Sequence, residues 1–332
     1  MHDLTIKYVD AFTTNTFSGN PAAVITDAAG LTIEEMQSIA KEINISESTY
    51  VTKPESKNAM FRIRFFTQSN QLDLSGHAVI ATCYALIEEG RVRLDDGKTT
   101  VMIETNLGDV PLDIYFSKDT YQGNADSTTG NRDGKILNGV NKGRLDRIMI
   151  HQDAGTHEKS RISIEEISDI LDIDPMEIKM TGLPMEFVSN GQHQFMIPVG
   201  HRETLLNLKP DLIRLSLMNA RYGIETNDIF TLDSISEECI SYSRHFAPAI
   251  GLWEDQGSGN AAATIGTYLT RHGITSTRNM IMEQGKDVHK LARIFVEIDY
   301  ADGSFNSVKM GGLATTSISR KINVSEGKVV II

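Results

Sequence analysis

Residues 75–86 read SGHAVIATCYAL, and residues 258–269 read SGNAAATIGTYL. In each stretch a turn of small residues opens directly onto an apolar segment, which predicts a short apolar helix. Both stretches have the order Ser, Gly, polar residue, Ala, and their starts lie 183 residues apart. A repeat at that separation predicts two equivalent halves rather than a solenoid, whose period is about 20 to 50 residues.

The start of each predicted helix is a candidate site for an anion. The first N–H groups of a helix have no intrahelical acceptor, and the helix dipole adds positive potential at that end. A glycine at the entry lets a ligand approach the backbone closely. A turn of this kind is also common in purely structural settings, so the repetition is the feature that favours binding. Two such helix ends brought together predict a protein that binds a small acid.

The composition narrows the class of protein. The chain has 332 residues, of which 40% are hydrophobic, enough for two domains or one large one. Its net charge is −12 and it has no basic cluster, which argues against nucleic acid or an anionic membrane as the main partner. No apolar run approaches the roughly 18 residues of a membrane span, and the first residues lack the regions of a signal peptide. We therefore expect a cytoplasmic protein.

The sequence gives no sign of a metal or a cofactor. Cys83 and Cys239 are the only cysteines, too few for a disulfide framework and not in a metal-ligand spacing. We interpret both as buried packing residues rather than catalytic thiols. The histidines show no paired ligand spacing, and we interpret His193, His245 and His289 as structural or exposed. We expect neither a bound metal nor a cofactor.

Patterns around the two helices extend the repeat. Thr32 and Glu35 form a capping box before an amphipathic helix whose apolar face runs from Ile33 to Ile43, and Ser163 starts a similar segment in the second half. Residues 64–67 read RFFT and residues 244–247 read RHFA, at similar distances before the two helices. The remaining apolar segments alternate as strands do. Each half is thus expected to be mostly strands around one long helix.

A polar segment separates the two halves. Residues 118–143 are rich in Gly, Asn, Asp, Ser and Thr, which favours turns and loop over packed structure. We interpret this segment as a surface insertion. The expected division is therefore an N-terminal half over residues 1–117, the insertion over 118–143, and a C-terminal half over 144–332. The last strand of the chain is a candidate to return to the N-terminal half.

Several local patterns together resemble the PhzF-like family of phenazine-biosynthesis isomerases, which belongs to the wider diaminopimelate epimerase-like fold. Their order and spacing cover nearly the whole chain, so the resemblance is specific. The patterns are DAF at 10–12, FSGNPAAV at 17–24, SESTYV at 46–51, RFFT at 64–67, SGHA at 75–78, FAP at 246–248, EDQGSGN at 254–260 and EQG at 283–285.

The resemblance implies an α+β fold of two pseudo-symmetric domains, each an antiparallel sheet curled around a central helix, with the active site in the cleft between them. It places the family's catalytic carboxylate at Glu47, its active-site histidine at His77 and its second acid at Asp255. The backbone amides that would hold the substrate carboxylate are those of Gly76, His77, Gly259 and Asn260.

The residue type just before each of the two helices distinguishes two-cysteine epimerases from isomerases that use a carboxylate. Epimerases of this fold use two cysteines as acid and base, one before each helix, and Ser75 and Ser258 stand at those positions here. A second register through residues 256–259 leaves the assignment of Ser258 open. A serine hydroxyl cannot replace a thiolate base unaided, which disfavours two-cysteine racemisation. We keep both serines as substrate-binding candidates, and we favour proton transfer by Glu47.

Each catalytic candidate has an ordinary alternative. A carboxyl that moves protons needs a pKa near neutral, which burial in a cleft supplies, and Glu47 lies between two serines before an apolar strand. On the sequence alone, Glu47 reads as a surface glutamate, and only the resemblance reverses this. His77 lies in a first helical turn, where the dipole favours the neutral imidazole, although a core or capping histidine also fits. Asp255 either orients His77, binds a substrate amino or hydroxyl group, or is an ordinary loop acid.

Departures from the family pattern leave the substrate open. Family members commonly carry an acidic residue just after the Phe-Thr strand, where this chain has Asn70-Gln71. They often carry Thr-Gly-Ser where this chain has Ser258-Gly259-Asn260. The basic motif that follows Glu-Gln-Gly in the family is altered here to VHKL at 288–291. We expect a cofactor-independent isomerase that moves a proton on a small carboxylate-bearing substrate, with a dihydro-hydroxyanthranilate-like compound as one candidate. The alternatives are an amino-acid epimerase of the same fold and a non-catalytic small-molecule binder. A homodimer is a further open expectation.

Overall fold

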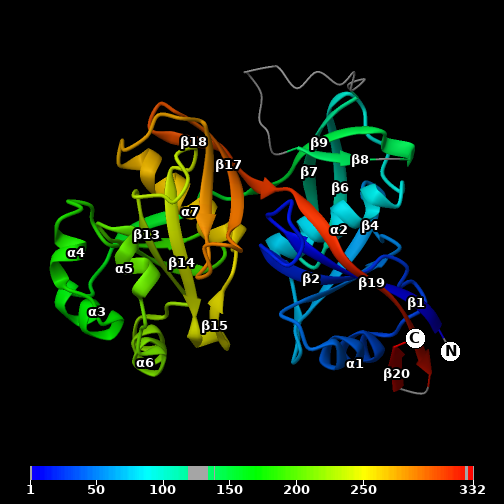
Figure 1. The fold of residues 1–332 in the computed structure, drawn as a ribbon, viewed down its shortest axis with the longest axis horizontal. Coiled ribbons are helices and arrows are strands. Elements are labelled where there is room, and N and C mark those ends of the chain that lie inside the picture. Colours follow the sequence, from blue (N-terminus) through cyan, green and yellow to red (C-terminus); the bar gives the residue numbers. More distant parts are fainter. Residues whose placement is uncertain (1, 119–133, 138, 326–327, 332) are drawn as a thin grey trace. The chain divides into compact units, whose positions relative to one another are not determined.

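The computed structural model describes residues 2–118, 134–137, 139–325 and 328–331, and it divides the chain into two compact units (Figure 1). Unit 1 comprises residues 1–151 and 311–332, and unit 2 comprises residues 152–310. The end of the chain therefore belongs to unit 1, where the strand over Ala314–Ser325 pairs antiparallel with the first strand. The three-part division expected at residues 117 and 143 stays a prediction.

Unit 1 consists of strands in the order β20-β19-β1-β2-β3-β4-β6-β7-β9-β8. The pairs β2–β3 and β4–β6 are parallel and the other neighbours are antiparallel. Its elements are β1 (His2–Ala11), β2 (Asn20–Ile25), α1 (Ile33–Ile43), β3 (Ser48–Thr52), β4 (Phe61–Phe66), β5 (Gln71–Leu72), α2 (Gly76–Glu88), β6 (Gly97–Thr105), β7 (Gly108–Ser117), β8 (Lys135–Leu137), η1 (Gly139–Asn141), β9 (Gly143–Gln152), β19 (Ala314–Ser325) and β20 (Lys328–Ile331).

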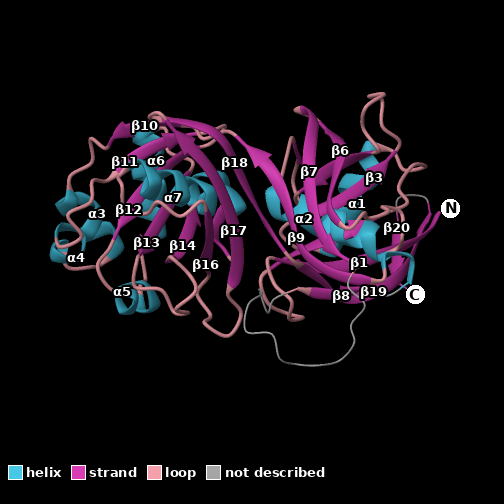
Figure 2. Cartoon of the chain, turned by 90° about the horizontal axis from the view of Figure 1, so that it is seen from above, coloured by secondary structure: helices cyan, strands magenta, loops and turns pink. Residues whose placement is uncertain are grey.

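Helix α2 is the centre of unit 1. Every residue from His77 to Ile87 is buried, because small and apolar side chains occur all round this helix and strands enclose it (Figures 1 and 2). Helix α1 covers the outside of the sheet instead. Its capping box between Thr32 and Glu35 is confirmed, with Glu35 N donating to Thr32 Oγ1 at 3.2 Å. Ile33, expected on the apolar face, is 48% exposed, because it lies in the first turn of α1.

Unit 2 repeats this plan with strands in the order β10-β11-β12-β13-β14-β16-β17, in which β12–β13 and β14–β16 are parallel. Its elements are β10 (Thr156–Lys159), α3 (Ile164–Leu171), α4 (Pro175–Lys179), β11 (Glu186–Ser189), β12 (His193–Pro198), α5 (Arg202–Asn207), α6 (Leu212–Tyr222), β13 (Thr226–Thr231), β14 (Ser241–Ala247), η2 (Pro248–Ile250), β15 (Leu252–Asp255), α7 (Gly259–Arg271), β16 (Asn279–Gln284), β17 (Ala292–Ala301) and β18 (Ser304–Gly312), whose last residues enter unit 1.

Helix α7 corresponds to α2, since both are buried and both begin at the repeated turn. The outer helices do not correspond in the way the sequence indicates. Ser163 caps α3 as expected, accepting from Glu166 N, but α3 lies between the antiparallel strands β10 and β11. Helix α1 connects the parallel strands β2 and β3 along the chain. In unit 2 the equivalent parallel strands are β12 and β13, and the segment that connects them contains α5 and α6.

Most of the predicted insertion, residues 119–133 and 138, lies outside the described residues. Its last part is packed rather than loose. Asn141 is buried, accepts from Leu94 N at 3.0 Å and donates to the carbonyls of Ile87 and Val92 at 3.2 and 2.7 Å. The end of this segment therefore packs against residues 87–94 of unit 1.

Both cysteines of the chain lie in the protein interior. Cys83 and Cys239 are buried and unpaired with each other, and burial above all raises the pKa of both thiols to about 12. Such thiols are inert packing residues, as expected. Within the described ranges, no helix has the length and apolar character needed to cross a membrane.

Candidate active site

The start of α2 brings three of the predicted residues together. Glu47 directly precedes β3, and the hydrogen bond from Ala23 N to Glu47 O, 3.0 Å long, fixes its backbone against β2. His77 is the second residue of α2. His77 Nε2 lies 3.8 Å from Glu47 Oε2, and the side chains are only 7% and 17% exposed, respectively. A carboxylate and an imidazole thus share one nearly dry site in unit 1.

Ser75 holds the other side of the imidazole. It occupies the N-cap position of α2 in an extended conformation, but its hydroxyl makes no capping hydrogen bond. Ser75 Oγ lies instead 3.3 Å from His77 Nδ1. Among the described residues, His77 Nε2 is buried without a hydrogen-bond partner and faces Glu47 Oε2 at 3.8 Å, so this nitrogen is available to exchange a proton. The arrangement is suited to relaying a proton at Glu47.

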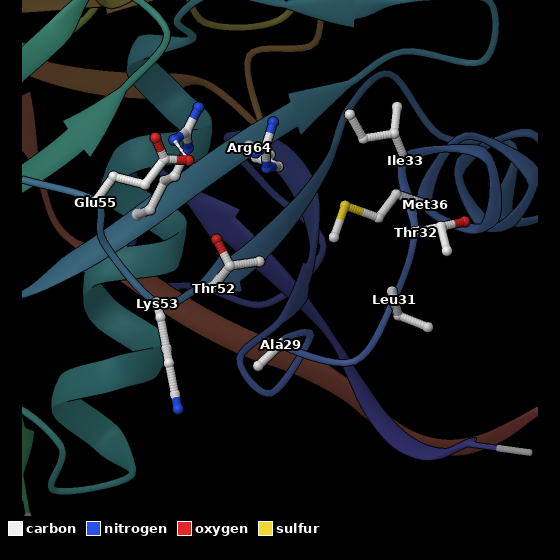
Figure 3. Close-up of a pocket in the computed structure, with 10 residues that line it drawn as sticks. Ala29, Leu31, Thr32, Ile33, Met36, Thr52, Lys53, Glu55 and Arg64 are labelled. Carbon is white, nitrogen blue, oxygen red and sulfur yellow. Dashed lines mark hydrogen bonds and ion pairs between the residues drawn. The ribbon is translucent and has the colours of Figure 1, made fainter.

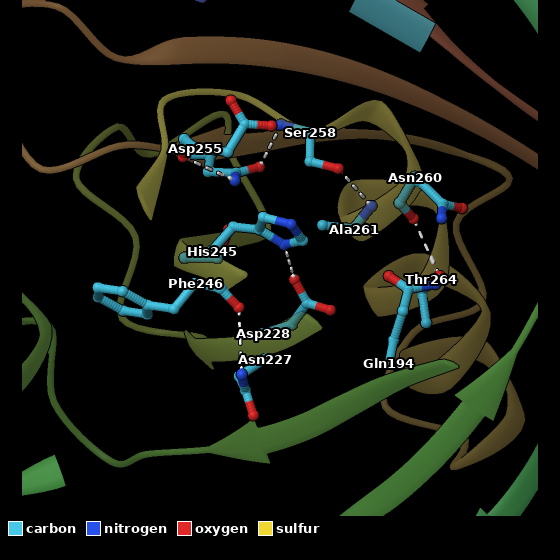
Figure 4. Close-up of polar contacts among 12 residues, drawn as sticks. Gln194, Asn227, Asp228, His245, Phe246, Asp255, Ser258, Asn260, Ala261 and Thr264 are labelled. Carbon is cyan, nitrogen blue, oxygen red and sulfur yellow. Dashed lines mark hydrogen bonds and ion pairs between the residues drawn. The ribbon is translucent and has the colours of Figure 1, made fainter. Parts of the chain in front are cut away.

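The equivalent turn in unit 2 is held differently (Figure 4). Ser258 Oγ accepts from Ala261 N at 3.2 Å and so caps α7, while Ser258 N donates to Gln284 Oε1 at 3.0 Å. The first intrahelical bond runs from Ala262 N to Ser258 O. The amides of Gly259 and Asn260, which precede it, therefore have no acceptor within the helix.

The side-chain amide of Asn260 makes its hydrogen bonds within the protein. Its Oδ1 accepts from Asn190 Nδ2 at 2.6 Å and from Gln152 Nε2, and its Nδ2 donates to Gln192 Oε1 at 2.7 Å. All of these partners belong to unit 2. Asn260 therefore offers a ligand its backbone N–H rather than its amide group. The role that the resemblance implies for this backbone amide stays a prediction.

Asp255 ends β15 and lies opposite His245 in the β14–β15 ladder. His245 contacts a residue that sequence reasoning missed: its Nδ1 lies 2.5 Å from Asp228 Oδ1, and both side chains are buried. Burial alone lowers the pKa of His245, but the Asp228 carboxylate outweighs it, with help from Asp255, and the pKa is raised. His245 is thus structural, as expected, and lies beside Asp255 with its protonated form favoured by the Asp228 carboxylate (Figure 4).

The signal for this pair comes from the structure. Asp228 lies in the middle of a strand whose residues are all buried, where an acid needs a charged or hydrogen-bonded partner. The partner lies on the next strand, and only the β13–β14 register, which places Asp228 opposite His245, identifies it. Trp253, which lies beside Glu254 and Asp255 in the sequence, is 57% exposed. Among the described residues, no group of three or more His, Cys, Asp or Glu side chains is arranged to hold a metal.

Comparisons with known proteins agree with this architecture. The family model for phenazine biosynthesis-like protein matches residues 9–320. A protein of Clostridium acetobutylicum named as an uncharacterized isomerase is 30% identical over 311 residues, which cover 92% of this chain and 93% of that protein. The trans-2,3-dihydro-3-hydroxyanthranilate isomerase of Pseudomonas aeruginosa is 26% identical, covering 92% and 94%.

The fold has a counterpart among solved structures. The crystal structure of a Bacillus anthracis phenazine biosynthesis protein of the PhzF family matches with a TM-score of 0.80 and 25% identity, covering 98% of this chain and 100% of that one. The α+β fold expected from the resemblance is confirmed.

Proposed function

The chain belongs to the phenazine biosynthesis-like protein family and is an isomerase, and we propose that Glu47 is the group that moves the proton. The observation that carries this proposal is the contact of 3.8 Å between Glu47 Oε2 and His77 Nε2 in a nearly dry site. A positioned carboxylate takes a proton from one substrate carbon and returns it to another. This chemistry rearranges a double bond without an external oxidant or reductant.

His77 and Ser75 support that step. Before Glu47 takes the proton and after it returns it, the ionised carboxylate lies beside His77 Nε2, which can turn an N–H toward it, and Ser75 keeps the ring oriented through Nδ1. Asp255 and the amides of Gly259 and Asn260 are proposed to act on the same substrate. Backbone N–H groups at the start of α7 that have no acceptor within the helix suit a carboxylate, as do those of Gly76 and His77 at the start of α2.

The substrate class follows from these donors. We propose a small molecule that carries a carboxylate next to the carbon framework on which the proton moves. The Pseudomonas aeruginosa relative is named for trans-2,3-dihydro-3-hydroxyanthranilate, which carries a carboxylate and makes that compound the first candidate. Amino-acid epimerisation is the second candidate function, since epimerases share the fold. The replacement of two cysteines by Ser75 and Ser258 disfavours it.

Incubation in deuterium oxide tests the function. Purified protein is incubated with trans-2,3-dihydro-3-hydroxyanthranilate, or with a panel of free amino acids, and proton NMR follows each C–H signal. Isomerase activity predicts that the anthranilate precursor rearranges and that deuterium enters one carbon of the product. Exchange at the α-carbon of an amino acid would establish the epimerase instead. Binding of the precursor without exchange would establish a non-catalytic binder.

A further inference from the structure

A pocket lies in unit 1, away from the candidate catalytic residues. It has a volume of about 400 Å³ and lies between the start of α1 and the strands β3 and β4. Figure 3 shows Arg64 and Thr52 on the strands, across from Ile33 and Met36 of α1. Neither Glu47 nor His77 lines it. Its volume falls in the range of pockets that hold small molecules, about 300 to 1,000 Å³.

The internal repeat shows what a buried arginine needs in this fold. In unit 2, Arg244 is only 2% exposed and forms a two-pronged ion pair with Glu254, with both N–O distances 2.7 Å. It also donates to the carbonyls of Leu205 and Leu208 at 2.9 and 2.8 Å. The charge of Arg244 is thus fully matched by unit 2 itself.

In unit 1 the corresponding arginine has lost its carboxylate. The β4–β5 pair repeats the β14–β15 pair, and this register places Arg64 where unit 2 has Arg244, and Gln71 where unit 2 has Glu254. An amide carries no charge to balance a guanidinium. Over the described residues, no carboxylate lies within 4.0 Å of the Arg64 guanidinium, and the Gln71 Nε2 donor is buried without an acceptor.

The neighbouring arginine adds another donor. Arg62 Nη1 pairs with Glu55 and Glu104, which leaves the buried Arg62 Nε with no acceptor in the described part of the chain. Burial, and then the charge of Arg62, lowers the pKa of Arg64, and the carboxylates of Glu55 and Glu104 oppose this shift. The pocket wall therefore holds a half-buried guanidinium that no carboxylate of the described residues contacts directly, beside a buried N–H group that has no acceptor there.

We propose that this pocket binds a small organic monocarboxylate with an apolar body. The carboxylate accepts from Arg64 in the two-pronged geometry that guanidinium and carboxylate favour. The apolar body packs against Leu31 and Met36, which also line the pocket. A phosphate would leave this apolar wall uncovered, and its greater charge would be repelled by Glu55, another lining residue.

The test uses phenylacetate as the probe and the Met36 methyl group as the reporter. Methionine methyl groups are labelled with ¹³C, the Met36 signal is identified by its loss in Met36→Leu, and its shift is followed during titration. Wild-type protein is expected to bind phenylacetate at least tenfold more tightly than neutral phenylacetamide and tenfold more tightly than inorganic phosphate.

Two variants test the role of the Arg64 positive charge. Arg64→Gln removes the guanidinium, and Gln71→Glu supplies the internal carboxylate that unit 2 has in Glu254, which should occupy Arg64 without removing it. Both are expected to weaken phenylacetate binding at least tenfold. Lys41→Gln, which removes an exposed positive charge from α1 outside the pocket, is the matched control and should leave the affinity within twofold.

Three outcomes would overturn the proposal. The first is no shift of the Met36 signal in wild-type protein at millimolar phenylacetate. The second is binding that survives both Arg64→Gln and Gln71→Glu, and the third is equal affinity for phosphate and phenylacetate. Glu47→Gln should not change the titration, so failure of this site and failure of the proposed catalytic site are separate results.

Discussion

Replacing Asp228 by Asn tests the buried pair at His245. The change keeps the size of the side chain and one acceptor oxygen but removes the charge that stabilises protonated His245, 2.5 Å away. Loss of one partner from a buried ion pair costs about 3 to 5 kcal/mol, and a charge-assisted hydrogen bond contributes about 1.5 to 3 kcal/mol. Because Asn still accepts a hydrogen bond, we expect the free energy of unfolding to fall by about 2 to 3 kcal/mol at pH 6.

The raised pKa of His245 determines how the free energy of unfolding changes with pH. The pKa of His245 is raised in the folded state, so the pair contributes fully below the unfolded value of about 6.5 and its contribution is lost as pH rises through the folded pKa. In that window, wild-type stability should fall by about 1.4 kcal/mol per pH unit from this group alone. Asp228→Asn should flatten this slope.

Urea denaturation at several pH values measures both quantities, and ¹⁵N NMR of the imidazole reports its protonation. Asp169→Asn is the matched control, because the Asp169–Arg214 pair has the same 2.5 Å separation but lies exposed. An exposed pair contributes about 0 to 1 kcal/mol, so the control should lose no more than that. Equal losses in the two variants, or a neutral His245 at pH 6 in wild-type protein, would refute the reasoning.

Three further predictions address other parts of the molecule. Ser75→Ala should lower kcat while leaving the thermal midpoint nearly unchanged, because its hydroxyl contacts His77 and does not cap α2; unchanged kcat would remove Ser75 from the site. Gly266→Ala should lower the free energy of unfolding by about 1 to 3 kcal/mol, since the added methyl would lie 2.9 Å from a methyl of Val296; a neutral effect in urea denaturation would show that this contact yields easily. Asn141→Ala should destabilise unit 1 by about 1 to 3 kcal/mol, because Leu94 N and two carbonyls would lose their partner; shortening within residues 119–133 serves as the comparison and should shift the midpoint less.

Local patterns in the sequence predicted the helices best. The turns at Ser75 and Ser258 and the capping box at Thr32 are local signals, and each marks a helix start in the structure. The same local view could not distinguish the two serines. Ser258 caps its helix, whereas Ser75 contacts His77, because the residue two positions later is a histidine in one turn and an asparagine held by other amides in the other.

Long-range pairings lay beyond the sequence alone. The partnership of Asp228 with His245 depends on strand register, as does the loss of a carboxylate partner at Arg64. The sequence showed that Asn70-Gln71 replaces an acidic residue of the family pattern. It did not show that Arg64 thereby lacks a carboxylate partner, which became clear only from the Arg244–Glu254 pair at the equivalent place in unit 2. The composition of residues 118–143 likewise concealed Asn141, whose burial depends on contacts with residues 87–94.

The most direct test of the account measures deuterium incorporation by Glu47→Gln. The substitution is nearly isosteric but removes the proton-accepting carboxylate next to His77, so circular dichroism should remain that of the wild type. The control is Glu42→Gln, which alters an exposed glutamate of α1. With the substrate turned over by wild-type protein in deuterium oxide, we predict that exchange and rearrangement vanish together in Glu47→Gln and persist in Glu42→Gln. A folded Glu47→Gln protein that still introduces deuterium at the wild-type rate would contradict the central claim.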